Sequence, residues 1–192
     1  MLGNLTDLIA QAKAGEAVAF PTDTVPGLGI LPAHAEKIYR LKGRSADKPL
    51  ILLGHNPDAL WPFVQGPSIA WAQWRDLGHQ YWPGALTLVL PASDAVPLAV
   101  HPQDPSTIGI RVPADPLALQ LLAATGPLAT TSANLSGGPP LLTASAISNQ
   151  FPSISVWAET TAKNRTPSTV IKWLSPGWQI LRQGEIVVHL TS

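Results

Sequence analysis

The chain has 192 residues, and its twelve basic residues are balanced by twelve acidic ones. This balance argues against a protein that binds nucleic acid mainly through bulk positive charge. The lack of cysteine excludes disulfides, thiolate metal sites and a cysteine nucleophile. We expect one domain over residues 1–192, because this length buries an adequate core, in a cytoplasmic protein with no membrane segment.

The beginning of the chain is predicted to alternate helix, strand and loop. Apolar residues recur at helical spacing over residues 5–14, and "AVAF" (17–20) is typical of a buried strand. Pro21 ends this strand, so we expect residues 22–29 to form a Thr- and Gly-rich loop and residues 33–41 to form a helix. A polar loop between a strand and a helix is a favourable place for a ligand.

The next elements continue this alternation. We expect a short strand at 49–54, helices over 57–64 and 68–81, and a strand at 85–90. These segments have strand and helix patterns in turn, which is the pattern of an α/β or α+β domain.

The second half of the chain is richer in strands. In "STIGIRV" (106–112) the alternation puts Thr107 and Arg111 on the same face of a strand. A helix over 117–124 leads into the strand-like "PLATTSA" (127–133). The remaining strand candidates are "ISVW", "STVIKW", "WQILR" and "EIVVHL", at residues 154–157, 168–173, 178–182 and 185–190. The whole pattern favours a twisted sheet with some antiparallel pairing.

Basic residues gather in "KIYRLKGRSADKPLIL", residues 37–52. Lys42 and Arg44 end the predicted helix and Lys48 precedes the next strand, so these cations can converge on one concave loop. Such side chains neutralise polyphosphate oxygens. The alternative is that they only complement the helix dipole, which is worth about 0.3–1 kcal/mol each. Spacing alone leaves both interpretations open.

Two further segments carry candidate binding groups. Ser132 and Asn134 follow a predicted strand, where hydroxyl and amide groups either face a ligand or form an ordinary turn. Arg111 lies in an otherwise apolar strand, and burying its charge is costly without an anionic partner. That partner is either a bound anion or an internal Asp or Glu.

The common nucleotide and metal motifs are missing from the sequence. There is no GxxxxGK[ST] loop, and "GLGILP" lacks the third glycine of a dinucleotide fingerprint. The five histidines are scattered and none is in an HExxH pattern, so we expect no protein-built metal site.

Seven segments, taken in order, resemble the YrdC-type threonylcarbamoyl-AMP synthase family, also called TsaC. They are "FPTDTVPGLG", "KGRSADKPL", "WPGALTLVL", "STIGIRVP", "TTSANLSGGPP", "PSTVI" and "ILRQGEI". The resemblance spans residues 18–186 and is to the short form with a single YrdC-like domain. It implies an α/β (α+β) fold, with a twisted open mixed sheet, flanking helices and a large basic concave cavity.

The resemblance also implies a reaction. ATP, L-threonine and bicarbonate give threonylcarbamoyl-AMP and diphosphate, and the product serves threonylcarbamoyladenosine modification of tRNA. Other proteins carry out the transfer to tRNA. Mg²⁺ is expected to arrive with ATP, because magnesium usually keeps waters and phosphate ligands.

Site residues follow from the matched motif positions. Arg44 and Lys48 are implied as the catalytic cations at the phosphates. The implied nucleotide-binding residues are Lys42, Arg44, Lys48, Thr107, Ser132, Asn134, Pro140 and Arg182. The implied threonine-binding residues are Thr22, Arg111, Thr130 and Ser168.

The chain departs from the family pattern at the threonine side of the site. Pro26 stands where many relatives have an aromatic residue, and Leu53 stands where some carry a histidine. Two other functions remain as alternatives. One is an RNA-binding module of the same fold, with weak RNA binding also possible for a synthase. The other is a carbamoyl-transfer domain like that of hydrogenase-maturation proteins, which are larger and carry zinc-finger segments.

Overall fold

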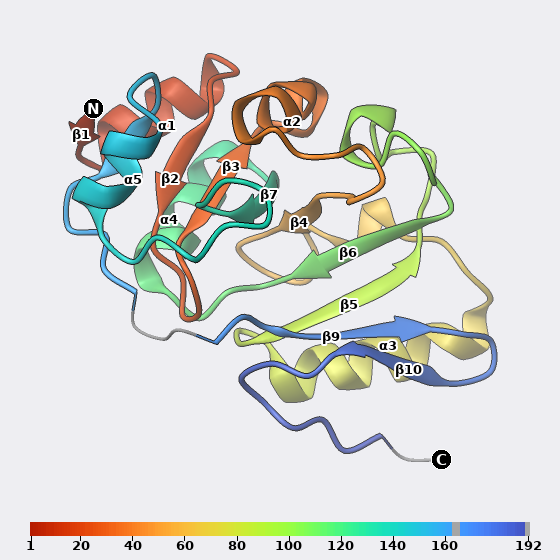
Figure 1. Cartoon of the computed structure of the whole chain (residues 1–192). Coiled ribbons are helices and arrows are strands. Elements are labelled where there is room, and N and C mark those ends of the chain that lie inside the picture. The colour runs from red at the N-terminus through yellow and green to blue at the C-terminus, as the bar shows by residue number, and fades with distance from the viewer. Residues whose placement is uncertain (163–165, 191–192) are drawn as a thin grey trace.

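The apolar strands of the chain pair into one mixed sheet, seen in a computed structural model that describes residues 1–162 and 166–190 (Figure 1). The sheet has ten strands in the order β1-β8-β2-β3-β7-β4-β6-β5-β9-β10. Their bounds are β1 Leu2–Gly3, β2 Val18–Phe20, β3 Gly27–Ile30, β4 Ile51–Leu53, β5 Leu86–Pro91, β6 Thr107–Arg111, β7 Leu128–Ser132, β8 Ser155–Trp157, β9 Thr169–Trp173 and β10 Trp178–Arg182. Parallel and antiparallel pairs are mixed, which confirms the predicted fold class.

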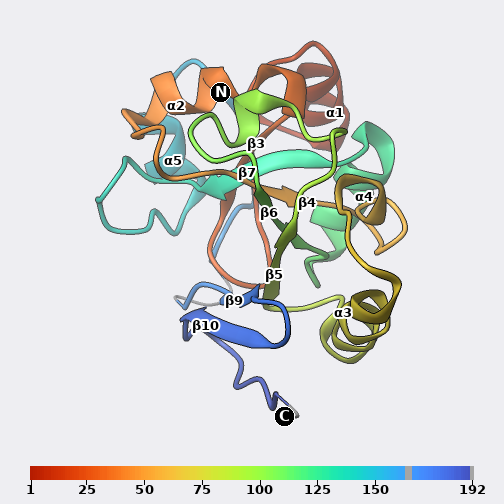
Figure 2. The same ribbon diagram turned by 90° about the vertical axis from the view of Figure 1, so that its right-hand side faces the viewer.

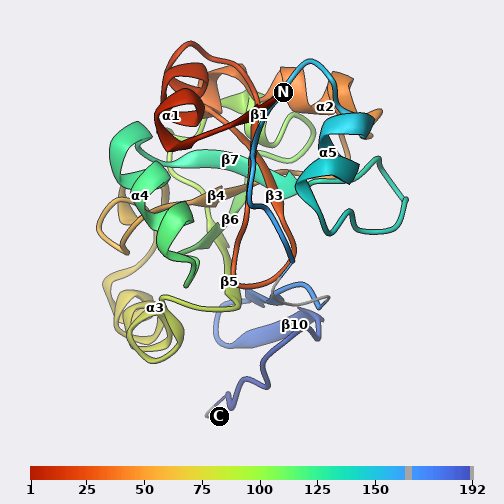
Figure 3. The ribbon, with the colours of Figure 1, turned by 90° about the vertical axis from the view of Figure 1, so that its left-hand side faces the viewer.

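Helices cover both faces of the sheet. They are α1 Leu5–Lys13, α2 Glu36–Lys42, α3 Ser68–Tyr81, α4 Pro116–Thr125 and α5 Ala144–Gln150. Apolar side chains of α1 and α4 form one core cluster, whereas those of α2, α3 and α5 belong to the other. Figure 3 shows α1 and α4 on one side of the strands and α2 and α5 on the other. β9 and β10 are at one end of the strand order and lie at the bottom of the molecule in Figure 2.

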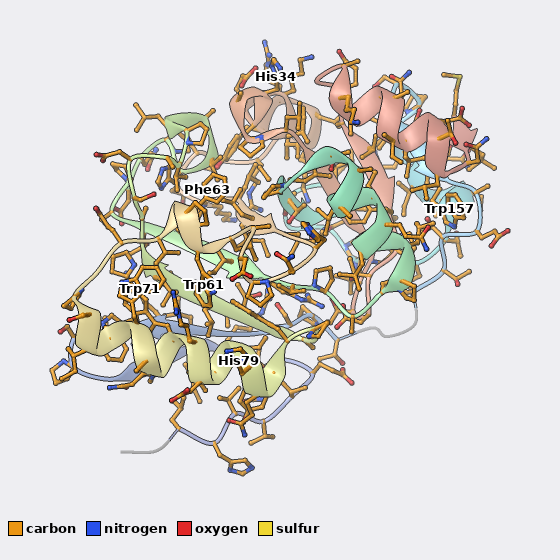
Figure 4. The ribbon with its side chains drawn as sticks, turned by 180° about the vertical axis from the view of Figure 1, so that it is seen from behind. His34, Trp61, Phe63, Trp71, His79 and Trp157 are labelled. Atoms are coloured by element: carbon orange, nitrogen blue, oxygen red, sulfur yellow. The ribbon has the colours of Figure 1, made fainter. Side chains whose placement is uncertain are left out.

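Tryptophan rings pack α3 against the sheet, and Figure 4 labels two of these rings, Trp61 and Trp71. Trp74 is fully buried, with its ring centroid 5.3 Å from that of Trp71 and 6.0 Å from that of Trp173 on β9. Trp71 in turn makes an edge contact with Trp61, at 5.7 Å between centroids. Aromatic pairs at such distances add to the stabilisation that burial already provides. These rings therefore serve packing.

The structure confirms the predicted loop over residues 22–26 but places residues 27–29 in a strand. Gly27–Ile30 is strand β3, paired on one side with β2 and on the other with β7. A Cβ atom at Gly29 would lie 2.8 Å from Cε1 of Phe20, so the neighbouring ring occupies the space of a side chain. Gly29 admits a close neighbour in the sheet and does not mark a loop.

Two other predicted elements are wrong. The helix expected over residues 57–64 is reduced to the 3₁₀ turn Trp61–Phe63, in which Pro62 lacks the N–H that an α-helix needs. The strand expected over residues 185–190 does not form. Instead, the His189 amide donates to the Tyr81 hydroxyl at 3.3 Å, and the chain runs beside α3. The sequence interpretation also missed β1 and α5.

Membrane insertion by a helix finds no support in the described residues, 1–162 and 166–190. None of their helices combines the length and the apolar character that a bilayer span needs.

Candidate active site

Strand ends and loops enclose a cavity of about 520 Å³ on one face of the sheet. This volume lies in the range of small-molecule sites. The predicted site residues in its wall are Thr22, Arg44, Arg111, Thr130, Ser132, Asn134, Pro140, Ser168 and Arg182. Segments from all parts of the sequence thus meet at one place, as the resemblance implies.

Arg44 lies in the loop after α2 and is held by that loop. Its Nε donates to the Lys48 carbonyl at 2.8 Å, and its Nη2 donates to the Pro49 carbonyl at 3.0 Å. Burial lowers the pKa of Arg44, while Tyr39 and Asp47 act in the opposite direction. The guanidinium stays charged, because the ordinary pKa of arginine is far above neutrality. Arg44 is therefore a fixed cation in the wall, with donors left for a ligand.

The segment after β7 is folded around Asn134. The amide Nδ2 of Asn134 donates to the carbonyls of Leu135 and Gly138, at 2.8 and 2.7 Å, and its Oδ1 accepts a hydrogen bond from Ser132 Oγ. The side chain thereby closes a tight loop that places Gly138 and Pro140 in the cavity wall. Asn134 shapes this wall through its own loop.

Lys42 lies behind the wall. Its ammonium is buried, and Nζ donates to the Ser132 carbonyl and to Thr131 Oγ1, the latter at 3.4 Å. Its own carbonyl accepts from the Ser136 amide at 3.2 Å. Lys42 thus joins the end of α2 to the segment after β7. Burial first, and then the charge of Arg44, lower the pKa of Lys42 to about 7.

We expect Lys42 to make the stability of the protein depend on pH. The folded-state pKa of about 7 lies below the unfolded value, so between the two the unfolded chain binds more protons. The free energy of unfolding should therefore rise from pH 7 to about pH 9 by about 2 kcal/mol from this group alone. Urea unfolding of the wild type and of Lys42→Met measures this difference.

For Lys42→Met, we expect the free energy of unfolding to change less with pH over the same range, because the variant has no amine at this position. Equal slopes in the two proteins would contradict a lowered pKa of Lys42.

Arg111 is the most buried cation of the cavity. Its Nη2 lies 2.6 Å from Asp23 Oδ1, and only 5% of the Arg111 side chain is exposed. Nε donates to the Gly84 carbonyl at 2.9 Å and Nη1 donates to Thr24 Oγ1 at 3.0 Å. Burial lowers the pKa of Arg111, and Asp23 partly offsets this effect. The sequence left two partners open for Arg111, a bound anion or an internal Asp or Glu. The structure shows the internal partner, which is Asp23.

The hydroxyl of Thr22 is committed to the protein. It donates to the Val25 carbonyl at 2.7 Å and accepts from the Thr24 amide at 3.2 Å. It also lies 3.1 Å from Thr24 Oγ1, which accepts from Arg111. Since the hydroxyl proton of Thr22 goes to the Val25 carbonyl, Thr24 is the donor between the two hydroxyls. The chain of bonds therefore runs from Arg111 through Thr24 to Thr22.

The far wall is held by the residues around β9. Arg182 donates through Nη2 to the Ser168 carbonyl at 2.9 Å, and Ser168 Oγ lies 2.9 Å from Thr87 Oγ1. Gly184 packs so tightly here that a Cβ atom would clash with the Pro167 carbonyl oxygen. This close approach requires glycine at position 184, and the hydrogen bonds to Ser168 hold Arg182 at the cavity.

Three predicted residues do not line the cavity. Lys42 is behind the wall, and Lys48 is exposed on the loop of Arg44. Thr107 lies at the start of β6, four residues before Arg111, which is about 13 Å along a strand. The shared face of Thr107 and Arg111 does not bring both to the site. Their roles with a nucleotide stay predictions.

The sequence interpretation also missed parts of the site. Thr24, Ile51 and Thr131 line the cavity, and Asp23 and Thr87 support it from behind. Pro26 and Leu53, singled out as departures from the family pattern, do lie in the wall. Thr24 had a signal in its position two residues after Thr22, but the partners of Asp23 and Thr87 are distant in sequence.

Together, the mixed α/β sheet and the arginine-lined cavity are typical of a protein that binds a small anionic ligand. Arg44 and Arg182 make no salt bridge among the described ranges 1–162 and 166–190, so both retain positive charge for such a ligand. Comparison with known proteins identifies the family to which this chain belongs.

The family model Sua5/YciO/YrdC, described as "Telomere recombination", matches residues 10–184. A threonylcarbamoyl-AMP synthase of Vibrio campbellii is 36% identical over 188 residues, covering 94% of this chain and 99% of the relative. A threonylcarbamoyl-AMP synthase of Bacillus subtilis is 44% identical over 143 aligned residues, with a coverage of 68% of this chain and 39% of the longer relative. This chain belongs to the Sua5/YciO/YrdC family.

A solved structure supports the same assignment. P. abyssi Sua5 complexed with L-threonine superimposes with a TM-score of 0.86 at 32% identity, over 94% of this chain and 54% of the other. The family and the YrdC-like fold expected from the seven sequence segments are confirmed.

Proposed function

We propose that this protein is a threonylcarbamoyl-AMP synthase, which forms threonylcarbamoyl-AMP and diphosphate from L-threonine, bicarbonate and ATP. The observation that carries the proposal is the cavity itself, in which Arg44, Arg111 and Arg182 surround a wall of threonine and serine hydroxyls. The relatives that share the synthase name and the threonine complex of P. abyssi Sua5 support it.

The reaction needs alignment and charge neutralisation more than a protein nucleophile. The amine of threonine and bicarbonate give a carbamate and water. A carbamate oxygen then attacks the α-phosphorus of ATP, and the bond to the bridging oxygen of the β-phosphate breaks. Diphosphate leaves with that bond's electron pair. Fixed cations that face the developing charge lower the barrier of such a step.

The wall offers suitable groups for each reactant. We assign Arg44 to the ATP phosphates, because its own loop holds it and it makes no salt bridge among residues 1–162 and 166–190. Arg111 faces the threonine carboxylate with the N–H that remains on each terminal nitrogen. Ser168 is buried between Thr87 and Arg182, and we assign it to the threonine side of the cavity together with Arg111. The Ser132 to Pro140 segment cradles the nucleotide.

We propose that Mg²⁺ enters as a complex with ATP. Within 1–162 and 166–190, no three His, Asp or Glu side chains converge as a metal-ligating group. Asp23, the carboxylate beside the cavity, is already bound to Arg111 and to the Ala114 amide. The protein residues therefore do not fit a resident metal, whereas phosphate oxygens are ligands that magnesium prefers.

The product has a defined use in the proposed pathway. Threonylcarbamoyl-AMP serves the modification of tRNA to threonylcarbamoyladenosine, and separate transfer proteins are the proposed downstream partners. A mixed anhydride of this kind is reactive, which favours its direct use by a second enzyme.

The test is an omission assay with the purified protein. Diphosphate should be released from ATP and Mg²⁺ when L-threonine and bicarbonate are both present, and should fall to background when either is left out. Diphosphate release that ignores threonine, or tight binding of RNA at physiological salt with no diphosphate, would contradict the proposal. The second result would favour the RNA-binding alternative.

A further inference from the structure

We propose that Asp23 is a positioning residue for Arg111, which fixes the arginine so that its free N–H groups face the carboxylate of L-threonine. This inference rests on the proposed function. It gives a role to a residue that lies outside the cavity wall but directly behind it.

The hydrogen bonds of Asp23 fall on one oxygen. Asp23 Oδ1 accepts from Arg111 Nη2 at 2.6 Å and from the Ala114 amide at 3.0 Å. The second bond ties the carboxylate to the backbone just after β6, the strand that carries Arg111. Asp23 therefore has a fixed position relative to the arginine that it holds.

The other contacts of Arg111 make its orientation unique. Nε is bound to the Gly84 carbonyl and Nη1 to the Thr24 hydroxyl. With Nη2 on Asp23, every nitrogen of the guanidinium has one protein acceptor. A planar group held at all its nitrogens cannot rotate, and one N–H remains on each terminal nitrogen for a ligand.

Charge balance alone does not explain this arrangement. Asp23 neutralises Arg111 and by charge alone would weaken the attraction for a substrate carboxylate. Its benefit must come from orientation, since a preorganised donor loses less freedom on binding. When the carboxylate is removed, the change in charge strengthens threonine binding, whereas the loss of orientation weakens it. The sign of the measured change therefore tests the inference.

The experiment measures binding of L-threonine alone and of ATP alone, by calorimetry, to the wild type, Asp23→Asn and Asp23→Ala. Asparagine can keep its amide oxygen at the Oδ1 position, so both hydrogen bonds survive without the charge. We expect Asp23→Ala to weaken threonine binding by about tenfold or more. Asp23→Asn should change it by less than about threefold, and ATP binding should stay unchanged in both.

A matched control is Glu16→Gln, which removes the carboxylate of the surface pair between Lys37 Nζ and Glu16 Oε1, at 2.9 Å. It should leave both ligands unaffected. If Asp23→Ala does not fold, Asp23→Ser replaces it, because serine is too short to reach Arg111.

Several results would overturn the inference. They are unchanged threonine binding in the alanine or serine variant, equal changes in this variant and Asp23→Asn, or an equal loss of ATP binding. If wild-type protein does not bind L-threonine, the proposed function falls together with the inference. If the wild type binds threonine and the variants fail the pattern, only the inference falls.

Discussion

Replacing Arg44 by alanine is expected to lower kcat/KM by about a hundredfold or more, since removing one fixed charged donor from a transition-state site typically has this effect. The structure gives the reason. Arg44 is held at Nε and Nη2 by the Lys48 and Pro49 carbonyls, so its charge is in place before the nucleotide arrives. The rate of diphosphate release with saturating threonine and bicarbonate measures the effect.

Lys48→Ala is the informative comparison for this prediction. Lys48 is in the same loop but is exposed and outside the cavity wall. It can act in the reaction only if an ATP phosphate extends to it or if the loop moves toward the bound ATP. A loss as large as that of Arg44→Ala would show that the lysine reaches the reacting phosphates. Near wild-type activity of Arg44→Ala would remove this arginine from the site.

Replacing Arg111 by alanine is expected to damage both stability and threonine binding. The change leaves the carboxylate of Asp23, whose side chain is only 17% exposed, without its cation. Breaking such a pair should cost about 3 kcal/mol of the free energy of unfolding. It should also raise the threonine KM by at least about tenfold, with a smaller effect on the KM for ATP.

Urea unfolding and steady-state kinetics check the two parts separately. The double variant Asp23→Asn/Arg111→Met removes both charges, so we expect it to recover part of the lost stability but none of the threonine affinity. If Arg111→Ala is as stable as the wild type, this result would contradict the predicted cost of breaking the buried pair. An effect confined to ATP would mean that Arg111 serves the other ligand.

Short-range patterns were sufficient for much of the fold. The helix expected over 117–124 is α4, and the strand expected at 127–133 contains β7, because local apolar periodicity determines both. Strand β3 was not predicted by the same reasoning. Gly29 marks close packing against Phe20, which depends on a partner strand that local sequence does not reveal.

The site shows the same division. Arg44, Ser132 and Asn134 were found from their positions at the ends of elements, and all three line the cavity. The contact between Asp23 and Arg111 joins residues 88 positions apart, so only the fold discloses it. Thr107 shares a strand face with Arg111 but does not line the cavity, because a shared face says nothing about distance along the strand.

In the proposed function, one cavity joins threonine, bicarbonate and ATP into a single product. The most direct measurement is mass spectrometry of a reaction that contains isotope-labelled bicarbonate. We predict an adenylate that carries the threonine residue and the bicarbonate carbon together and that disappears in Arg44→Ala. ATP hydrolysis to unlabelled nucleotide, with no adduct that contains both threonine and the label, would contradict the claim.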